Sequence, residues 1–301
     1  MLTRPIDPPA VAIRRVHAVV NPMSGGVGPG TVGELASLLG ELGLDHQISE
    51  LRPGRCEETV RAAVDTRPDL MIVLGGDGTA RLVAETCGPG GPLVAPLSGG
   101  TMNKLGHALY GPKPWREALT GALTHGQARW MPGGEVGGRA FFCSAVLGSP
   151  ALWAQAREAI RARKLGRAWR RAMIARRRAF VAPLRYAFDG VDRGQGLVIR
   201  LICPTTSRAL AEDEGALEAA AFDPRDTRAG VRLAVNNLLG DWRDDPDVTL
   251  RRCRSARAWA HDPIPCMLDG EFFRLGRHVE GRFRRHAFRA LAPAVEGAKP
   301  A

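Results

Sequence analysis

The sequence predicts a two-domain α+β protein, in which an α/β domain built on a parallel sheet precedes a β-rich domain of the sandwich type. Two patterns lead to this expectation. Over the first third of the 301 residues, short apolar runs alternate with segments of helical periodicity, and glycine-rich turns follow three of the runs. After about residue 130 the chain changes to short strand-like segments separated by turn residues. We place the domains at residues 1–130 and 131–301, leaving open a return of the extreme C-terminus to the first domain.

The first domain reads as alternating strands and helices. Strands are expected at residues 16–20, 45–51 and 70–74 and from residue 93, and helices at residues 31–43, 56–66, 80–87 and 115–124. The run at 70–74 is apolar throughout, which is typical of a parallel strand covered on both faces. Such alternation predicts a parallel sheet whose ligand lies at the carboxyl ends of the strands.

The second domain is predicted from short segments that read as strands. They occur at residues 133–145, 183–189, 196–204, 217–222, 231–236 and 256–261. Their regular spacing, with turn residues between them, favours a β-sandwich. A basic insertion with helical periodicity at residues 151–180 interrupts the strand pattern.

Composition places the chain among ordinary globular proteins. Apolar residues make up 45% of it, and no apolar run approaches the ~20 residues of a membrane-spanning helix. The first residues lack the apolar core of a signal peptide. The six cysteines form no CxxC pair and are too sparse for a disulfide scaffold. We therefore expect a cytoplasmic protein with reduced cysteines.

Directly after the fully apolar run, the chain holds three glycines within four positions, Gly75, Gly76 and Gly78. Glycines let a bulky anion approach the main chain, and the following helix, with Thr79 as its expected cap, would direct its free N–H groups at the same place. The expected ligand is a phosphate. Asp77 is unusual there, since a carboxylate beside phosphates is repulsive unless it holds a metal, accepts a proton or binds a hydroxyl. The alternative is a simple strand-turn-helix junction.

Two similar turns follow other predicted strands. Residues 21–26 form a Gly/Ser/Asn turn after the first strand, and residues 99–103 offer amides, a hydroxyl and the Asn103 side chain after the strand that begins at residue 93. Because the carboxyl ends of parallel strands share one edge of a sheet, the three turns should converge on one site. The spacing GxGxxG is missing after the first strand, so an ordinary dinucleotide-binding fold is not predicted.

As motifs, the three turns are N-P-x-S-G at residues 21–25, G-G-D-G-T at 75–79 and G-T-x-N at 100–103. In this order they resemble the diacylglycerol kinase catalytic domain family, which includes bacterial diacylglycerol kinases and the ceramide and sphingosine kinases. G-G-D-G-T alone is shared with NAD kinases and phosphofructokinases, whereas G-T-x-N and the later L-D-G-E at residues 268–271 favour the lipid kinases. The resemblance extends over residues 14–290.

The resemblance implies a nucleotide-binding α/β domain, a β-rich second domain and an active site in the cleft between them. It also implies an ATP-dependent kinase that uses Mg²⁺ and phosphorylates the primary hydroxyl of a membrane lipid. Diacylglycerol is the default acceptor, and ceramide or a sphingoid base is the second choice. NAD kinase is the alternative with the same chemistry.

Carried over residue by residue, the resemblance assigns Asp77 and Glu271 to catalysis. Glu271 is the expected base for the proton of the lipid hydroxyl, and Asp77 would act on Mg²⁺ or on the nucleophile. Asp77 and Asp269 are the candidate metal ligands. The nucleotide is expected to be bound by Asn21, Pro22, Ser24, Gly25, Gly75, Gly76, Gly78, Thr79, Gly100, Thr101, Asn103 and Lys104.

Three positions depart from the family pattern. The family's G-T-x-N-D ends in an Asp of a metal-linked acidic network, where this chain has Lys104. Two further family Asp positions fall on Pro132 and Ser149. Three interpretations of Lys104 are open. It contacts a phosphate directly and takes over part of the role of the metal ion, or it marks a subgroup with a different acceptor. The third interpretation is weakened catalysis. A nucleotide-binding, membrane-docking protein without turnover therefore stays an alternative.

The net charge of +11 is concentrated in one segment. Residues 157–178, which begin and end with Arg157 and Arg178, hold ten Lys or Arg residues and one acid, and so carry +9. In a helix, an apolar stripe that includes Trp169 would lie beneath this arginine-rich face, which suits an anionic membrane surface. The competing interpretation is a solvated helix packed on the sandwich. No nucleic-acid motif accompanies the charge. We therefore expect a peripheral protein on the inner face of the membrane, of undetermined oligomeric state.

Overall fold

The structure is a computed structural model that describes residues 12–148, 183–211, 213–224 and 242–293. The chain divides into two compact units. The first combines Met1–Met131 with Arg285–Ala301, and the second comprises Pro132–Arg284. Two long strands, β5 (Gly126–Val136) and β16 (His278–Pro293), contribute residues to both units.

The first unit is built on a parallel sheet. Its strands are β1 (Arg15–Val20), β2 (Asp45–Glu50), β3 (Leu70–Gly75) and β4 (Leu93–Ser98). They are ordered β2-β1-β3-β4, all pairs are parallel, and the last part of β16 follows β4. All six residues of β3 are buried, as are five of the six in both β1 and β4. Apolar strands of this kind are required in a parallel sheet covered on both faces.

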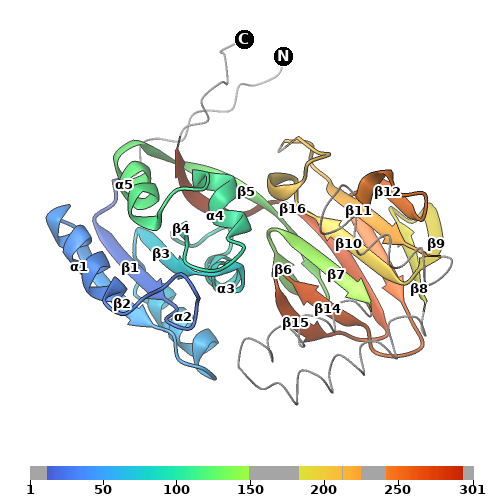
Figure 1. Ribbon diagram of the computed structural model, residues 1–301, viewed down its shortest axis with the longest axis horizontal. Helices are drawn as coiled ribbons and strands as arrows, with labels where there is room; N and C mark the ends of the chain where they lie inside the picture. Colours follow the sequence, from blue (N-terminus) through green and yellow to red (C-terminus); the bar gives the residue numbers. More distant parts are fainter. Residues whose placement is uncertain (1–11, 149–182, 212, 225–241, 294–301) are drawn as a thin grey trace, which may run out of the picture. The chain divides into compact units, whose positions relative to one another are not determined.

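Helices alternate with these strands (Figure 1). They are α1 (Thr31–Glu41), α2 (Cys56–Asp65), α3 (Asp77–Cys87), α4 (Lys104–Tyr110) and α5 (Trp115–His125). The sequence set no bounds for α4, which packs closely on β4: a Cβ on Gly106 would lie 2.9 Å from the hydroxyl of Ser98. At its other end, the buried hydroxyl of Tyr110 donates a hydrogen bond to the carbonyl of Leu291 in β16 at 2.6 Å.

Within its described residues, the second unit adds ten further strands to parts of β5 and β16. They are β6 (Arg139–Phe141), β7 (Ser144–Gly148), β8 (Leu184–Phe188), β9 (Asp192–Gly196), β10 (Val198–Ile202), β11 (Leu217–Phe222), β12 (Val248–Cys253), β13 (Ser255–Trp259), β14 (Pro265–Leu268) and β15 (Glu271–Arg274).

These strands form two antiparallel sheets (Figure 1). One runs β16-β13-β8-β9 with β5 and β6 attached, and the other runs β12-β11-β10-β7-β14-β15. Alternate residues of both sheets meet in a single core, which includes Phe141 and Phe188 from the first sheet and Leu147 and Leu201 from the second. Alternation of this kind produces a sandwich. The expected fold class, an α/β domain followed by a strand-rich domain, is confirmed.

Several expected elements need correction. Residues 133–145, expected as one strand, form three, because Gly137 and Gly138 adopt positive φ values of 58° and 78° and turn the chain between β5 and β6. Strands β9, β12, β14, β15 and β16 lie outside the expected strand ranges. The strand expected at residues 231–236 and the insertion expected at 151–180 lie outside the described residues.

No helix in the described part of the chain is long and apolar enough to cross a membrane. All six cysteines are free thiols, and five of them are buried.

Candidate active site

Three turns at the carboxyl ends of β1, β3 and β4 are joined by main-chain hydrogen bonds. We call residues 21–26, 75–79 and 99–104 the first, second and third turn. The amide of Gly26 donates to the carbonyl of Gly99 at 3.0 Å, and the amide of Gly99 donates to the carbonyl of Gly75 at 2.9 Å. The third turn therefore connects the other two. Parallel strands end at one edge of their sheet, and the predicted convergence of the turns follows from this.

The glycines of these turns serve two different purposes. A Cβ on Gly100 would lie 2.5 Å from the Cα of Gly76, and a Cβ on Gly99 would lie 2.8 Å from the nitrogen of Gly75. These glycines are needed because the main chains of the second and third turns touch. A Cβ on Gly25 would have no atom within 4 Å. The space beside Gly25 is therefore open to a ligand.

Polar side chains of the first turn hold the second turn. The amide nitrogen Nδ2 of Asn21 donates to Oγ1 of Thr79 at 2.8 Å, and the main-chain amide of Gly76 donates to Oγ of Ser24 at 3.2 Å. A hydroxyl can accept and donate at the same time. Since Oγ1 of Thr79 accepts from Asn21, its own hydrogen can be donated to a ligand oxygen.

The expectation that Thr79 caps the helix after the second turn is wrong. Helix α3 begins at Asp77, so Thr79 lies inside its first turn and bonds to Asn21 instead. The N-cap residue is Gly76, which has an extended main chain with φ −87° and ψ 177° and provides no side-chain cap. An uncapped helix start carries free N–H groups and partial positive charge, which favour a bound anion.

Asp77 is partly buried at this helix start, and one of its carboxylate oxygens is engaged. Oδ1 accepts a hydrogen bond from the amide of Leu105, at the beginning of α4, at 3.1 Å. Oδ2 has no hydrogen-bond partner within the described ranges. Asp77 therefore joins the second turn to the third and keeps one oxygen for a ligand.

The third turn is closed by the side chain of Asn103, which lies in the left-handed region with φ 49°. Its Oδ1 accepts from the amide of Gly100 at 2.7 Å, and its Nδ2 donates to the carbonyl of Gly100 at 3.0 Å. Both polar groups of Asn103 thus act within the turn, and its expected contact with a nucleotide stays a prediction. Lys104 follows directly and is partly buried, whereas Thr101 is exposed, as is Pro22 in the first turn.

The L-D-G-E element lies in the second unit, where Asp269 and Gly270 form a two-residue turn between β14 and β15. Both have positive φ, 46° and 92°, as a type I′ hairpin requires. Glu271 is the first residue of β15 and is partly buried. Glu271 therefore directly follows a tight hairpin turn, and its catalytic role stays a prediction.

The carboxylate of Asp269 accepts hydrogen bonds from three main-chain amides. Its Oδ2 accepts from the amide of Phe142 at 2.6 Å, and its Oδ1 accepts from the amides of Cys143 and Ser144 at 2.9 and 2.8 Å. The residue is only 7% exposed. This arrangement holds the start of β7 against the hairpin. Across the described residues, no group of three or more His, Cys, Asp or Glu side chains is placed to hold a metal ion.

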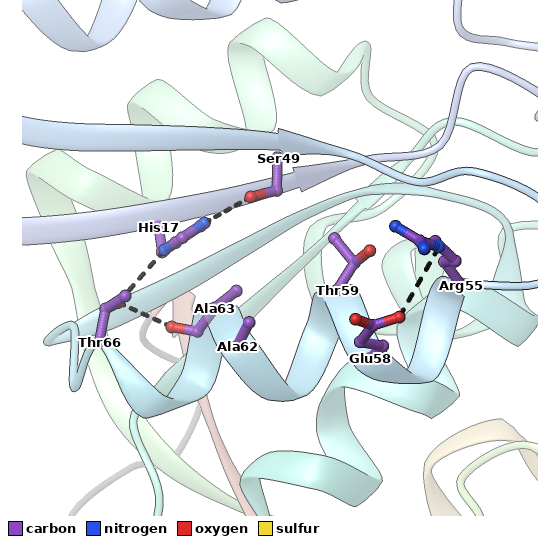
Figure 2. Close-up of a pocket in the computed structure, with 8 residues that line it drawn as sticks. All are labelled: His17, Ser49, Arg55, Glu58, Thr59, Ala62, Ala63 and Thr66. Atoms are coloured by element: carbon purple, nitrogen blue, oxygen red, sulfur yellow. Dashed lines mark hydrogen bonds and ion pairs between the residues drawn. The ribbon is translucent and has the colours of Figure 1, made fainter.

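A separate groove of about 380 Å³ lies along α2, and none of the predicted site residues lines it (Figure 2). His17 lies at its base, 5% exposed, with Nε2 2.9 Å from the hydroxyl of Ser49 and Nδ1 3.2 Å from that of Thr66. The Thr66 hydroxyl donates to the carbonyl of Ala63, so it accepts from Nδ1. Both ring nitrogens of His17 are therefore bonded, and burial lowers the pKa of its imidazole below the ordinary value.

Sequence comparison addresses the segment that carries the three turns. Residues 15–136 match the diacylglycerol kinase catalytic domain. The family expected from the motifs is confirmed for this part of the chain, which includes all three turns and ends with β5. Asp77 therefore lies in the segment that matches a lipid kinase family, whereas Glu271 lies beyond it.

Solved structures from Bacillus anthracis str. Sterne share the fold. A diacylglycerol kinase aligns with a TM-score of 0.67 at 16% identity, over 94% of this chain and 98% of its own. Two further structures are provisionally assigned as diacylglycerol kinases. One aligns with a TM-score of 0.69 at 17% identity, over 94% of this chain and 98% of its own. The other aligns with a TM-score of 0.66 at 18% identity, over 95% of this chain and 99% of its own. At this level of sequence identity, the similarity shows a shared fold. No curated protein matches the chain.

Sequence reasoning missed three features of this region. The first is the hydrogen bond from the amide of Leu105 to Asp77. These residues are 28 positions apart, and no local sequence pattern predicts a bond over such a separation. Met23 and Met102 occupy the variable positions of two motifs and are 71% and 54% exposed. Apolar residues inside otherwise polar turns were the available signal for these two.

Proposed function

We propose that this protein is an ATP-dependent lipid kinase that transfers the γ-phosphate of ATP to the primary hydroxyl of a membrane lipid. Diacylglycerol is the first candidate for the acceptor, and ceramide or a sphingoid base is the second. The proposal rests on the three hydrogen-bonded turns around Asp77, within the segment that matches a diacylglycerol kinase catalytic domain.

The phosphates of ATP are held by the open side of Gly25, by the uncapped start of α3 and by the hydroxyl of Thr79. Asn21 and Ser24 act indirectly in this proposal, because their side chains hold the second turn in place. Preorganised donors of this kind lower the cost of rearrangement when the phosphoryl group moves.

An acceptor with apolar chains is supported by the rim of the site. Met23 and Met102 are two of the five exposed large apolar side chains among the described residues. They lie in the first and third turns, which are bonded to each other through Gly26 and Gly99. Methionine adapts to irregular apolar partners, and grouped exposed apolar side chains commonly mark binding surfaces.

In the transfer step, Glu271 accepts the proton of the lipid hydroxyl, and Asp77 directs its free oxygen at the nucleophile or at the Mg²⁺ ion of the nucleotide. Mg²⁺ offsets charge on the phosphates. Asp269 supports Glu271 by fixing the hairpin that carries it. We further propose that residues 157–178, which lie outside the described ranges, dock the protein on the inner face of an anionic membrane.

The test is transfer of radiolabelled γ-phosphate from ATP to lipids in mixed micelles with Mg²⁺. Wild type should label diacylglycerol or a sphingolipid. Asp77→Asn should reduce the rate by at least about 100-fold, since it removes a charge needed in the transition state while Oδ1 can still accept from Leu105. The matched control is Asp45→Asn, an exposed residue of β2, which should keep wild-type activity.

Further arms of the assay separate the alternatives. Glu271→Gln should lose activity, with the exposed Glu280→Gln as its control. A Met23→Gln, Met102→Gln double variant should raise the lipid concentration needed for half-maximal rate without changing ATP affinity. Labelling of NAD but of no lipid would replace the proposal by an NAD kinase, and ATP binding without turnover across a lipid panel would leave only a nucleotide-binding protein.

A further inference from the structure

The charged side chains of the three turns are one carboxylate, on Asp77, and one ammonium group, on Lys104. They cancel, so the side chains leave the site without net charge. The terminal phosphates of a nucleotide carry several negative charges, and the partial charge of a helix start offsets only about half a unit. A site that binds such a ligand needs a cation placed against the phosphates, and Lys104 is the one cationic side chain of the three turns.

The side chains do not fit an Mg²⁺ ion held by the protein. Mg²⁺ takes about six oxygen ligands in near-octahedral geometry. Asp77 offers one free oxygen, because Leu105 engages the other. The carboxylate of Asp269 accepts three main-chain hydrogen bonds. In the part of the chain that the structure describes, no cluster of three or more potential ligands supplements them.

Lys104 stands at a fixed place in this site. The residue before it, Asn103, is tied to Gly100 by two side-chain hydrogen bonds, and the residue after it, Leu105, donates its amide to Asp77. Two adjacent contacts therefore determine where the main chain of Lys104 lies. Lys104 is therefore the direct neighbour of the residue that bonds to Asp77, the first residue of α3.

Lys104 is also free to bind an anion. It is partly buried and forms no ion pair with a described residue. The other lysine in the described ranges, Lys113, differs in both respects, since its side chain is 55% exposed and its Nζ pairs with Oε1 of Glu117 at 3.2 Å. Lys113 therefore provides a matched control.

We propose that Lys104 binds the terminal phosphates of the nucleotide directly and supplies positive charge that a protein-held metal ion would otherwise provide. This inference rests on the proposed nucleotide site. The ammonium group is a compact charge with three donors, well suited to phosphate oxygens. The protein then binds ATP without a divalent cation, and Mg²⁺ enters the site only as the partner of the nucleotide.

The experiment is calorimetric titration of the full chain with ATP, once in EDTA and once with Mg²⁺. Wild type should bind ATP in EDTA with a Kd within about tenfold of that with Mg²⁺. Lys104→Gln and Lys104→Met should each weaken binding in EDTA by at least about tenfold, Lys104→Arg should keep most of it, and Lys113→Gln should match wild type. The ³¹P resonance of the γ-phosphate should shift on binding to wild type, and less on binding to Lys104→Gln.

Each other result counts against the inference. ATP binding that requires Mg²⁺, or wild-type affinity of Lys104→Gln in EDTA, would overturn it. Loss of the folded circular-dichroism spectrum in both neutral variants would assign Lys104 a structural role instead. Absence of ATP binding by wild type under both conditions would overturn the proposed function as well. Lys104-dependent ATP binding with no lipid phosphorylated would overturn the proposed function alone and support the inference.

Discussion

Among single residues, Asp269 and Asp77 differ in how much of their carboxylate the main chain takes. Asp269 accepts three amides, from Phe142, Cys143 and Ser144, whereas Asp77 accepts one. A carboxylate that satisfies buried amides contributes to stability, because each amide left without an acceptor costs about 1–3 kcal/mol. Asp77 retains capacity for a ligand, and Asp269 has little.

Asp269→Ala should therefore destabilise the protein. We expect the free energy of unfolding to fall by about 3 kcal/mol or more, since three buried amides lose their acceptor. Urea denaturation measures the change. Asp262→Ala, at an exposed residue, should change it by less than about 0.5 kcal/mol. Loss of stability on addition of EDTA in wild type but not in Asp269→Ala would instead indicate that Asp269 holds a metal.

The buried His17 predicts a dependence of stability on pH. Burial lowers its pKa in the folded state below the ordinary value of 6.5. The unfolded chain thus takes up a proton at a higher pH than the folded chain. The stabilisation is complete above about pH 6.5 and is lost as the pH falls toward the folded-state pKa.

Thermal melting at several pH values tests this expectation. The melting temperature of wild type should decrease as the pH is lowered from about 7.5 to about 5.5, and that of His17→Gln should decrease less. His107→Gln, on the exposed side of α4, should follow wild type. Parallel pH profiles for wild type and His17→Gln would show that His17 is not the group responsible.

At the scale of elements, the turns depend on the direct contact between their main chains. A Cβ at position 100 would meet the Cα of Gly76 at 2.5 Å, a distance that neither main chain can accommodate without moving. Gly100→Ala should therefore separate the second and third turns and weaken ATP binding by at least about tenfold in calorimetry. The loss in free energy of ATP binding should exceed the loss in free energy of unfolding.

Gly40→Ala is the control for this substitution. Gly40 lies in α1, and a Cβ there would have no atom within 4 Å. Alanine favours a helix relative to glycine by up to about 1 kcal/mol, so this variant should be as stable as wild type or more stable. ATP affinity of Gly100→Ala equal to that of Gly40→Ala would show that contact between the turns is not required.

Elements were predictable where their signals are local. Apart from α4, the helices of the first unit and its strands β1 to β4 follow from apolar runs and helical spacing, and most ends agree within two residues. Errors occurred where glycines redirect the chain. The second turn passes into α3 three residues earlier than expected, and Gly137 and Gly138 divide one expected strand. The long β16 was not predicted, although polar and apolar residues alternate along its first half as in a half-buried strand.

For the whole molecule, the uneven charge is the property with the clearest consequence. Residues 157–178 account for +9 of the +11, and they lie outside the described residues. Each basic residue near an anionic bilayer contributes ~1 kcal/mol to binding. Replacement of Arg170, Arg171, Arg176 and Arg177 by Glu should therefore abolish sedimentation with anionic liposomes, and neutral liposomes should not sediment wild type. Unchanged sedimentation of the variant would exclude this segment as the docking surface.

The sequence by itself determined the fold class, the order of most elements in the first unit and the positions of three glycine-containing turns, because periodicity and glycine runs are local properties. Only the tertiary structure decided which polar groups of those turns are engaged and which remain free. Leu105 engages half of Asp77, Asn21 bonds to Thr79, and Asp269 serves the main chain at 142–144. Such hydrogen bonds join residues 28 to 127 positions apart. Local sequence patterns do not predict contacts over these separations.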